Sequence, residues 1–78
     1  MADERVEIYP GVTADRKVQG GQPVIKGTRL PVTTILGQLA AGVNFEEICE
    51  QYGVTTEDIR AALGYAATTL SQETVWAL

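Results

Sequence analysis

The 78-residue chain contains no histidine and a single cysteine, Cys49. It also lacks a pair of carboxylates set among apolar residues, so the side chains that usually carry acid–base or nucleophilic catalysis are scarce. Cys49 belongs to an amphipathic segment and is expected to pack in the core. It cannot form an internal disulfide, which agrees with a reducing compartment. We therefore expect no enzymatic activity, no metal site and no cofactor.

Long apolar runs are also missing. The longest is only a few residues, whereas a membrane-spanning helix needs about 20. The first ten residues, MADERVEIYP, carry charge where a signal peptide needs an apolar stretch. We expect a cytoplasmic protein that does not associate with membranes.

A third absence is the basic excess that usually marks nucleic-acid binding, since six Lys and Arg face ten Asp and Glu. The charge is unevenly distributed. Residues 1–43 hold five basic and four acidic residues, while residues 44–78 hold six acidic residues and one basic residue, Arg60. Contact with DNA phosphates would therefore need the N-terminal half, or a dimer that sums two surfaces.

The apolar content of 45% nevertheless indicates a folded chain. At this length we expect one domain over 1–78, comprising a short β element (6–31), a helical core (32–70) and a helical tail (71–78). The core must be thin, so self-association would supply additional burial.

Alternation of polar and apolar residues over 6–9 predicts a short strand that ends at Pro10-Gly11. Residues 12–19 are polar and irregular, which predicts a loop with a brief extended piece around Val18. The stretch 20–32, GGQPVIKGTRLPV, predicts a tight hairpin in which 24–25 and 29–30 flank Gly27 at a positive φ.

From Val32 the apolar period becomes helical, and Gly42 is placed to end this first helix. The residues from Asn44 to Glu47 match a capping box, which predicts the start of a second helix. This helix is expected to end at Gly53. Thr55 and Thr56 are both candidate N-caps of a third helix that reaches about Leu70. Ser71 either caps a new turn or is passed over by one continuing helix.

Residues 45–64 match a helix-turn-helix, a tight connection between two steeply crossing helices that often contains glycine. Gly53 occupies the turn, and the residues expected to face inward are Ile48, Tyr52, Val54, Ile59 and Ala62. The fold class that follows is mainly α, a homeodomain-like trihelical helix-turn-helix with a small N-terminal β-hairpin or short strands.

Side chains expected to point outward near the start of the second helix of this unit are Thr55, Thr56, Glu57, Arg60, Ala61 and Gly64. Arg60 could read a guanine edge, and the threonines could contact phosphate or a thymine methyl group. The alternative is a trihelical core with a solvated acidic face, because Glu57 and Asp58 would repel a phosphate backbone.

The Lys26-Gly27-Thr28 order and Pro23 exclude a Walker-type phosphate loop, which needs Gly-Lys-Ser/Thr and unblocked backbone donors. A simpler phosphate site is still compatible with the sequence, in which Lys26, Thr28 and Arg29 bind one phosphate of the DNA backbone. The alternative is that Arg29 pairs with an acid of its own domain, such as Glu47 or Asp58.

The C-terminal residues Val75, Trp76 and Leu78 form an apolar tail. They either pack on the third helix of the domain or, with Ile8, contact a partner or a second copy.

The segment GGQPVIKGTRLPVTTILGQLAAGVNFEEICEQYGVTTEDIRAAL resembles the bacterial domain-of-unknown-function family numbered 433, over about residues 8–67. The resemblance implies a homeodomain-like helix-turn-helix with a small N-terminal β element, and it marks the helix-turn-helix around Gly53 and Ile59 as the candidate DNA-binding unit. Some members are thought to be antitoxins of VapBC-like pairs, which bind operator DNA as dimers and block a PIN-like nuclease toxin. The family signature falls on Gly21, Pro23, Ile25, Lys26, Gly27, Thr28, Arg29, Pro31 and Val32.

Our leading hypothesis is a small dimeric DNA-binding antitoxin or transcriptional repressor. The alternative is a protein-interaction module that neutralises a basic nuclease partner without binding DNA. The tail, GYAATTLSQETVWAL, is less acidic than in the family, which leaves its contact with a toxin open.

Overall fold

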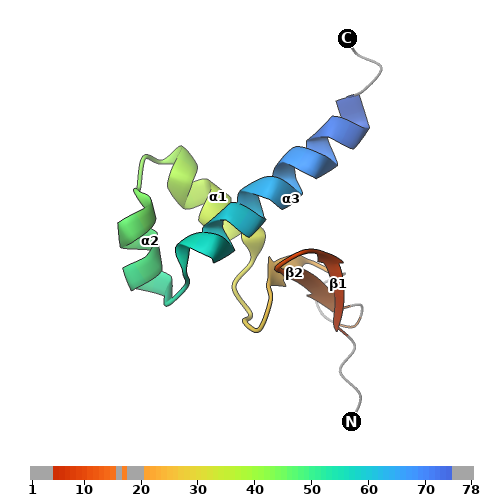
Figure 1. Cartoon of the computed structure of the whole chain (residues 1–78), viewed down its shortest axis with the longest axis horizontal. Helices are drawn as coiled ribbons and strands as arrows, with labels where there is room; N and C mark the ends of the chain where they lie inside the picture. Colours follow the sequence, from red (N-terminus) through yellow and green to blue (C-terminus); the bar gives the residue numbers. More distant parts are fainter. Residues whose placement is uncertain (1–4, 16, 18–20, 75–78) are drawn as a thin grey trace.

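The computed structural model describes residues 5–15, 17 and 21–74 and shows a mixed α/β fold (Figure 1). A small three-stranded antiparallel sheet packs beside three helices, so the β element is larger than a mainly α class implies. The elements are β1 (Arg5–Tyr9), β2 (Val12–Asp15), β3 (Pro23–Ile25), α1 (Val32–Ala40), α2 (Phe45–Tyr52) and α3 (Thr56–Thr74).

The sheet has the order β1-β2-β3, with β2 in the centre. Gly11 turns the chain between β1 and β2 at a φ of +89°, a conformation that side-chain-bearing residues rarely adopt. The β1–β2 register shifts between Glu7 and Tyr9, where β1 has one extra residue, Ile8. Tyr9 therefore pairs with Val12 at the end of the sheet that faces the helices.

The prediction of an irregular loop over 12–19 is wrong at its start, because residues 12–15 form the central strand. Val12 is completely buried, and it pairs with Tyr9 on one side and Ile25 on the other. Val12 and Ala14 alternate with Thr13 and Asp15 over only four residues, and the strand's partners lie on both neighbouring strands. Val18 lies outside the described residues.

The predicted hairpin is confirmed in part: the chain folds back antiparallel around Gly27, but residues 29–30 form no strand, and β3 pairs along its length with β2. The Ile25 N–H, which donates to the Leu30 carbonyl at 2.9 Å, joins the two predicted sides of this hairpin. An isolated bridge between Val24 and Pro31 continues this contact. Gly27 has the expected positive φ, +79°.

The predicted helix boundaries follow local capping chemistry. Gly42, just beyond α1, has a φ of +93°. The Asn44 side chain accepts the Glu47 N–H at 2.9 Å and so caps α2, and Gly53 ends α2 in the left-handed region at a φ of +70°. The third helix passes over Ser71 without a break and continues to Thr74. The tail residues Val75, Trp76 and Leu78 lie outside the described residues.

The core is a single layer in a molecule of 39 × 39 × 19 Å. Within the described residues it joins β2, β3 and all three helices through eight buried hydrophobic side chains: Val12, Ile25, Val32, Ile35, Ile48, Val54, Ile59 and Ala62. Of the residues expected to face inward, Tyr52 is half-buried and packs against this cluster with Cys49.

The sheet meets α3 through small residues, contrary to our expectation that Ala61 and Gly64 point outward. A side-chain carbon on Gly64 would lie 2.9 Å from Cζ of Tyr9, and one on Gly11 would lie 2.8 Å from Cβ of Ala61. Tyr9 also packs edge-on against Tyr65, with ring centroids 6.1 Å apart. This face of α3 is therefore covered by the β1–β2 turn.

Candidate nucleic-acid interface

The connection between α2 and α3 consists of three residues, Gly53 to Thr55. The Gly53 N–H donates to the Cys49 carbonyl at 2.9 Å, which closes the last turn of α2. Val54 then inserts into the core with 6% exposure. A short turn anchored by a buried residue fixes the direction in which the next helix leaves.

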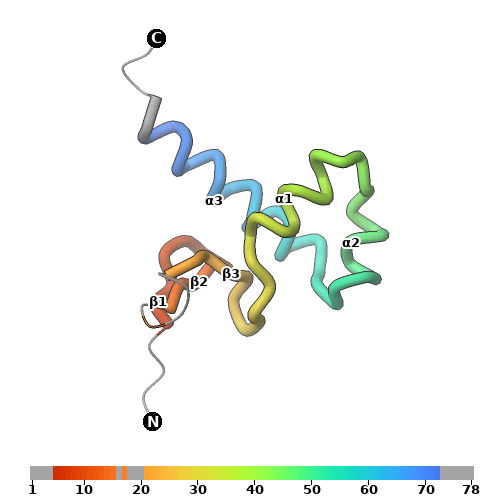
Figure 2. Tube along the Cα trace, turned by 180° about the vertical axis from the view of Figure 1, so that it is seen from behind, coloured from red at the N-terminus to blue at the C-terminus, as the bar shows by residue number. Residues whose placement is uncertain are grey.

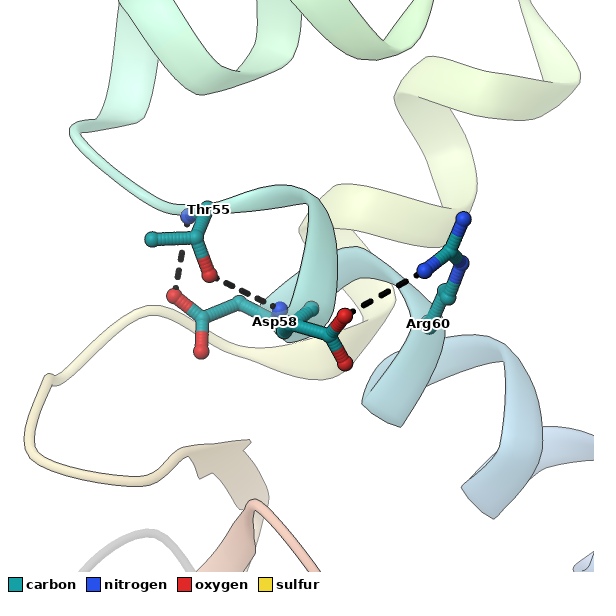
Figure 3. A network of polar contacts seen from close by, with 4 residues as sticks. Thr55, Asp58 and Arg60 are labelled. Atoms are coloured by element: carbon teal, nitrogen blue, oxygen red, sulfur yellow. Dashed lines mark hydrogen bonds and ion pairs between the residues drawn. The ribbon is translucent and has the colours of Figure 1, made fainter.

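The first turn of α3 is fixed by a reciprocal cap (Figure 3). The Thr55 hydroxyl oxygen accepts the Asp58 N–H at 3.1 Å, and Oδ2 of Asp58 accepts the Thr55 N–H at 3.0 Å. Thr55 is therefore the N-cap, and Thr56 is the first helical residue. As the hydroxyl accepts in this cap, its hydrogen remains available for donation to a ligand.

The exposed charges at the start of α3 partly neutralise one another. Nη1 of Arg60 lies 3.2 Å from Oε2 of Glu57, and both side chains are mostly exposed. This i,i+3 pair is weak in water, so Arg60 can exchange Glu57 for another partner at little cost. Thr55, Thr56 and Arg60 all lie on the exposed surface of this part of α3.

The loop after β3 carries the predicted cationic residues and is held by hydrogen bonds of its own. The Thr28 hydroxyl donates to the Ile25 carbonyl at 2.7 Å and accepts the Leu30 N–H at 3.0 Å. Its only hydrogen is thus engaged inside the loop. Thr28 shapes the loop, while the neighbouring side chains of Lys26 and Arg29 are exposed.

Lys26 is tied to the sheet by Glu7, a partner that the sequence analysis missed. Its Nζ lies 3.5 Å from Oε2 of Glu7, and the same oxygen accepts the Gly11 N–H at 3.0 Å. The Gly11 hydrogen bond, followed by the charge of Lys26, lowers the pKa of Glu7 below its ordinary value. The Lys26 N–H adds a bond to the Gly11 carbonyl at 2.9 Å.

The loop 26–30 and the turn 53–55 lie at the same edge of the molecule (Figures 1 and 2). Arg29 makes no ion pair with Glu47 or Asp58, the two acids considered from the sequence, nor with any other residue that the structure describes. This edge therefore presents the loop 26–30, with the exposed side chains of Lys26 and Arg29, together with the exposed start of α3.

Several residues of the family signature shape the backbone around β3 and the start of α1. Gly21 has a φ of +81°, Pro23 begins β3, and Pro31 immediately precedes α1 in extended geometry. Ile8, a candidate interface residue, is 44% exposed on β1.

Among the described residues no three His, Cys, Asp or Glu side chains cluster in a way that could hold a metal ion. Within the same ranges, no helix has the length and apolar character needed to cross a membrane.

Similarity to known proteins covers most of the chain. Residues 6–66 match the family described as "Protein of unknown function (DUF433)". The chain is 40% identical over 52 residues to the Mycobacterium tuberculosis protein named "Putative antitoxin VapB45", covering 67% of this chain and 22% of that protein. It is 39% identical over 56 residues to the Sinorhizobium fredii "Uncharacterized protein y4eO", covering 70% and 25%.

A solved structure supports the fold. The crystal structure of Rv2018 from Mycobacterium tuberculosis matches with a TM-score of 0.58 and 40% identity, over 67% of this chain and 24% of that one. The chain thus spans about a quarter of the length of the curated relatives that it matches. With a family match over residues 6–66, the chain belongs to the DUF433 family of proteins of unknown function.

Proposed function

We propose that the chain is a non-catalytic, cytoplasmic regulator of the antitoxin type, which binds operator DNA through the start of α3 and the loop 26–30 and represses transcription of a toxin–antitoxin pair. The antitoxin role is supported by 40% identity to a protein named as an antitoxin. The DNA-binding role rests on one observation: the capped, exposed start of α3 shares an edge with the cationic loop 26–30. A homeodomain-like helix-turn-helix would present its second helix in this way.

In this proposal the start of α3 enters the major groove. Arg60 leaves Glu57 to reach a base edge, while Thr55 and Thr56 donate to phosphate or contact a thymine methyl group. Arg29 and Lys26 bind the adjacent phosphates, and Thr28 holds the loop in the shape that presents them. An operator of two half-sites would require a homodimer, as in other helix-turn-helix regulators.

The test is an electrophoretic mobility shift with DNA from upstream of the encoding gene, repeated over a range of salt concentrations. Charge reversal in Arg29→Glu should weaken binding strongly and reduce the salt slope by about one for the lost phosphate contact. Arg60→Glu should weaken binding and relax sequence preference. Lys17→Glu is the matched control, because Lys17 follows the end of β2 opposite to the one beside Lys26.

Weak binding of both arginine variants beside normal binding of Lys17→Glu would support the contacts. Wild-type affinity in both arginine variants would refute them. Equal weakening in the lysine variant would show that only total charge matters.

A second candidate function is favoured by the acidic surface of α2. Its exposed carboxylates, Glu46, Glu47 and Glu50, have no basic residue in the same helix. Such a surface suits a basic partner, for example the RNA-binding face of a PIN-like nuclease toxin. Its charge would accelerate and select the encounter more than set the affinity.

Titration of the protein encoded by the adjacent gene separates the two candidates. A double Glu46→Lys, Glu50→Lys variant should slow association with a basic partner and leave operator binding intact or stronger. Tight binding to the neighbour with no DNA shift at low salt would refute the DNA proposal.

A further inference from the structure

The exposed large apolar side chains among the described residues fall on two adjacent elements. Val6 and Ile8 lie on the edge strand β1, and Leu63 and Leu70 lie on α3, with exposures of 40% and 59% for the two leucines. Residues 63 and 70 are seven apart, so they share one helix face, with Ala66 and Ala67 between them. This set, Leu63, Ala66, Ala67 and Leu70, is termed the α3 stripe.

The C-terminal half of α3 projects beyond the other elements (Figures 1 and 2). Tyr65 is the last α3 side chain that packs against the hydrophobic core. The nine residues from 66 to 74 extend the helix by about 13 Å beyond that contact. They include threonines and a serine, which are poor helix formers, and a helix this short is marginal in water without packing.

The sequence of this segment favours a partner surface that is likewise apolar and uncharged. Residues 61–72, AALGYAATTLSQ, contain no charged side chain on any face. An acidic or basic partner would find no charge to pair with over more than three turns. A second, equally uncharged α3 stripe would meet no repulsion.

The two charged residues that flank the segment have opposite signs, so they can pair between two antiparallel copies. Arg60 lies before it, and the next charged position after it, residue 73, is a glutamate. If two copies of α3 cross antiparallel between Ala66 and Ala67, Leu63 meets Leu70 of the partner subunit, because both lie equally far from the crossing point. The same register places position 60 opposite position 73 at each end. A parallel pair would instead bring like charges together.

We propose that the α3 stripe is the contact surface between two copies of this chain, packed antiparallel about Ala66 and Ala67. This inference rests on the proposed function only in its expectation of a dimer, and it specifies which surface forms that dimer. The two alanines allow close approach of the helices, and the leucines of each copy cover those of the other.

The test is analytical ultracentrifugation over a concentration series, with far-UV circular dichroism to monitor folding. Leu70→Glu should raise the dimer dissociation constant by roughly tenfold or more, since it places a charge within an apolar contact. The variant should remain folded, because Leu70 is 59% exposed in the single chain. Gln72→Glu adds the same charge two residues away on the opposite, exposed face of α3 and should dimerise as the wild type does.

The antiparallel register has its own test. Leu63→Glu and Leu70→Lys should each weaken self-association, whereas an equimolar mixture should recover it, because the introduced acid then meets the introduced base. No recovery would overturn the register. A wild type that stays monomeric from micromolar to millimolar concentration, a Leu70→Glu variant with wild-type dimerisation, or equal weakening by Gln72→Glu would overturn the surface.

These measurements contain no DNA, so failures of the two proposals can be distinguished. A monomeric wild type that still shifts the operator would refute this interface alone. A dimer that depends on Leu70 but shifts no operator would refute the DNA proposal alone. Arg60 belongs to both proposals, so the leucine variants give the cleaner separation.

Discussion

Two helical glycines should respond to alanine substitution with opposite signs. Gly37 lies on the exposed side of α1, and a side-chain carbon there would meet nothing within 4 Å. Gly64 lies within α3, where the same carbon would press on the ring of Tyr9, 2.9 Å from Cζ and 3.1 Å from Cε2. The pair therefore separates the intrinsic effect of glycine in a helix from the effect of packing between α3 and the sheet.

Removing glycine from a helix interior stabilises the folded state by up to about 1 kcal/mol, because alanine loses less backbone entropy. Gly37→Ala should gain this amount. Gly64→Ala gains the same but must displace Tyr9, which Tyr65 supports, and such over-packing costs about 1–3 kcal/mol. We expect Gly64→Ala to be less stable than Gly37→Ala by about 1–3 kcal/mol.

Urea denaturation followed by circular dichroism measures this difference, with all variants at one protein concentration because dimerisation would contribute to stability. The Tyr9→Phe background is the control, since it removes the hydroxyl that lies closest to the added carbon. Gly64→Ala should cost less there. If Gly64→Ala stabilises wild-type protein as much as Gly37→Ala does, the close packing of the β1–β2 turn on α3 is refuted.

Two further substitutions test the loops that shape the candidate interface. Thr55→Ala removes the acceptor of the Asp58 N–H and should destabilise the fold by about 0.5–2 kcal/mol in the same denaturation assay, whereas an unchanged midpoint would contradict the cap. Because the pKa of Glu7 is lowered on folding, its ionised form stabilises the protein above its unfolded-state pKa, and this contribution disappears as pH falls through the lowered pKa. Glu7→Gln should therefore be less stable than wild type at neutral pH, with a gap that closes on acidification; a gap independent of pH would contradict it.

The helices could be predicted from the sequence because their limits depend on neighbouring residues. Asn44 caps α2 through an N–H three residues away, and Gly53 ends α2 through its own φ. The sheet could not be predicted in the same way. Val12 is central because strands on both sides pair with it. The sequence of residues 12–15 alone does not indicate which strands those are.

For the candidate interface too, the local features could be predicted from the sequence and the long-range contacts could not. The cap at Thr55 and the loop around Gly27 follow from short-range signals, and both are present. The partner of Lys26 is Glu7, nineteen positions earlier in the chain, and the pairing depends on the β1–β2 turn that joins them. Helical periodicity placed Ala61 and Gly64 on one face of α3, but only the fold shows that the sheet covers this face.

The acidic start of α3 argues less strongly against DNA than the sequence suggested. Asp58 uses its carboxylate to cap the helix, and Glu57 is matched by Arg60, so neither is an isolated surface charge. The exposed charges without an ion pair in the described part of the chain include Arg29 on the loop after β3 and the glutamates of α2. These lie on separate elements, so DNA and a basic protein would use different surfaces. Reversal of charge at Arg29 or on α2 should therefore impair only one of the two activities.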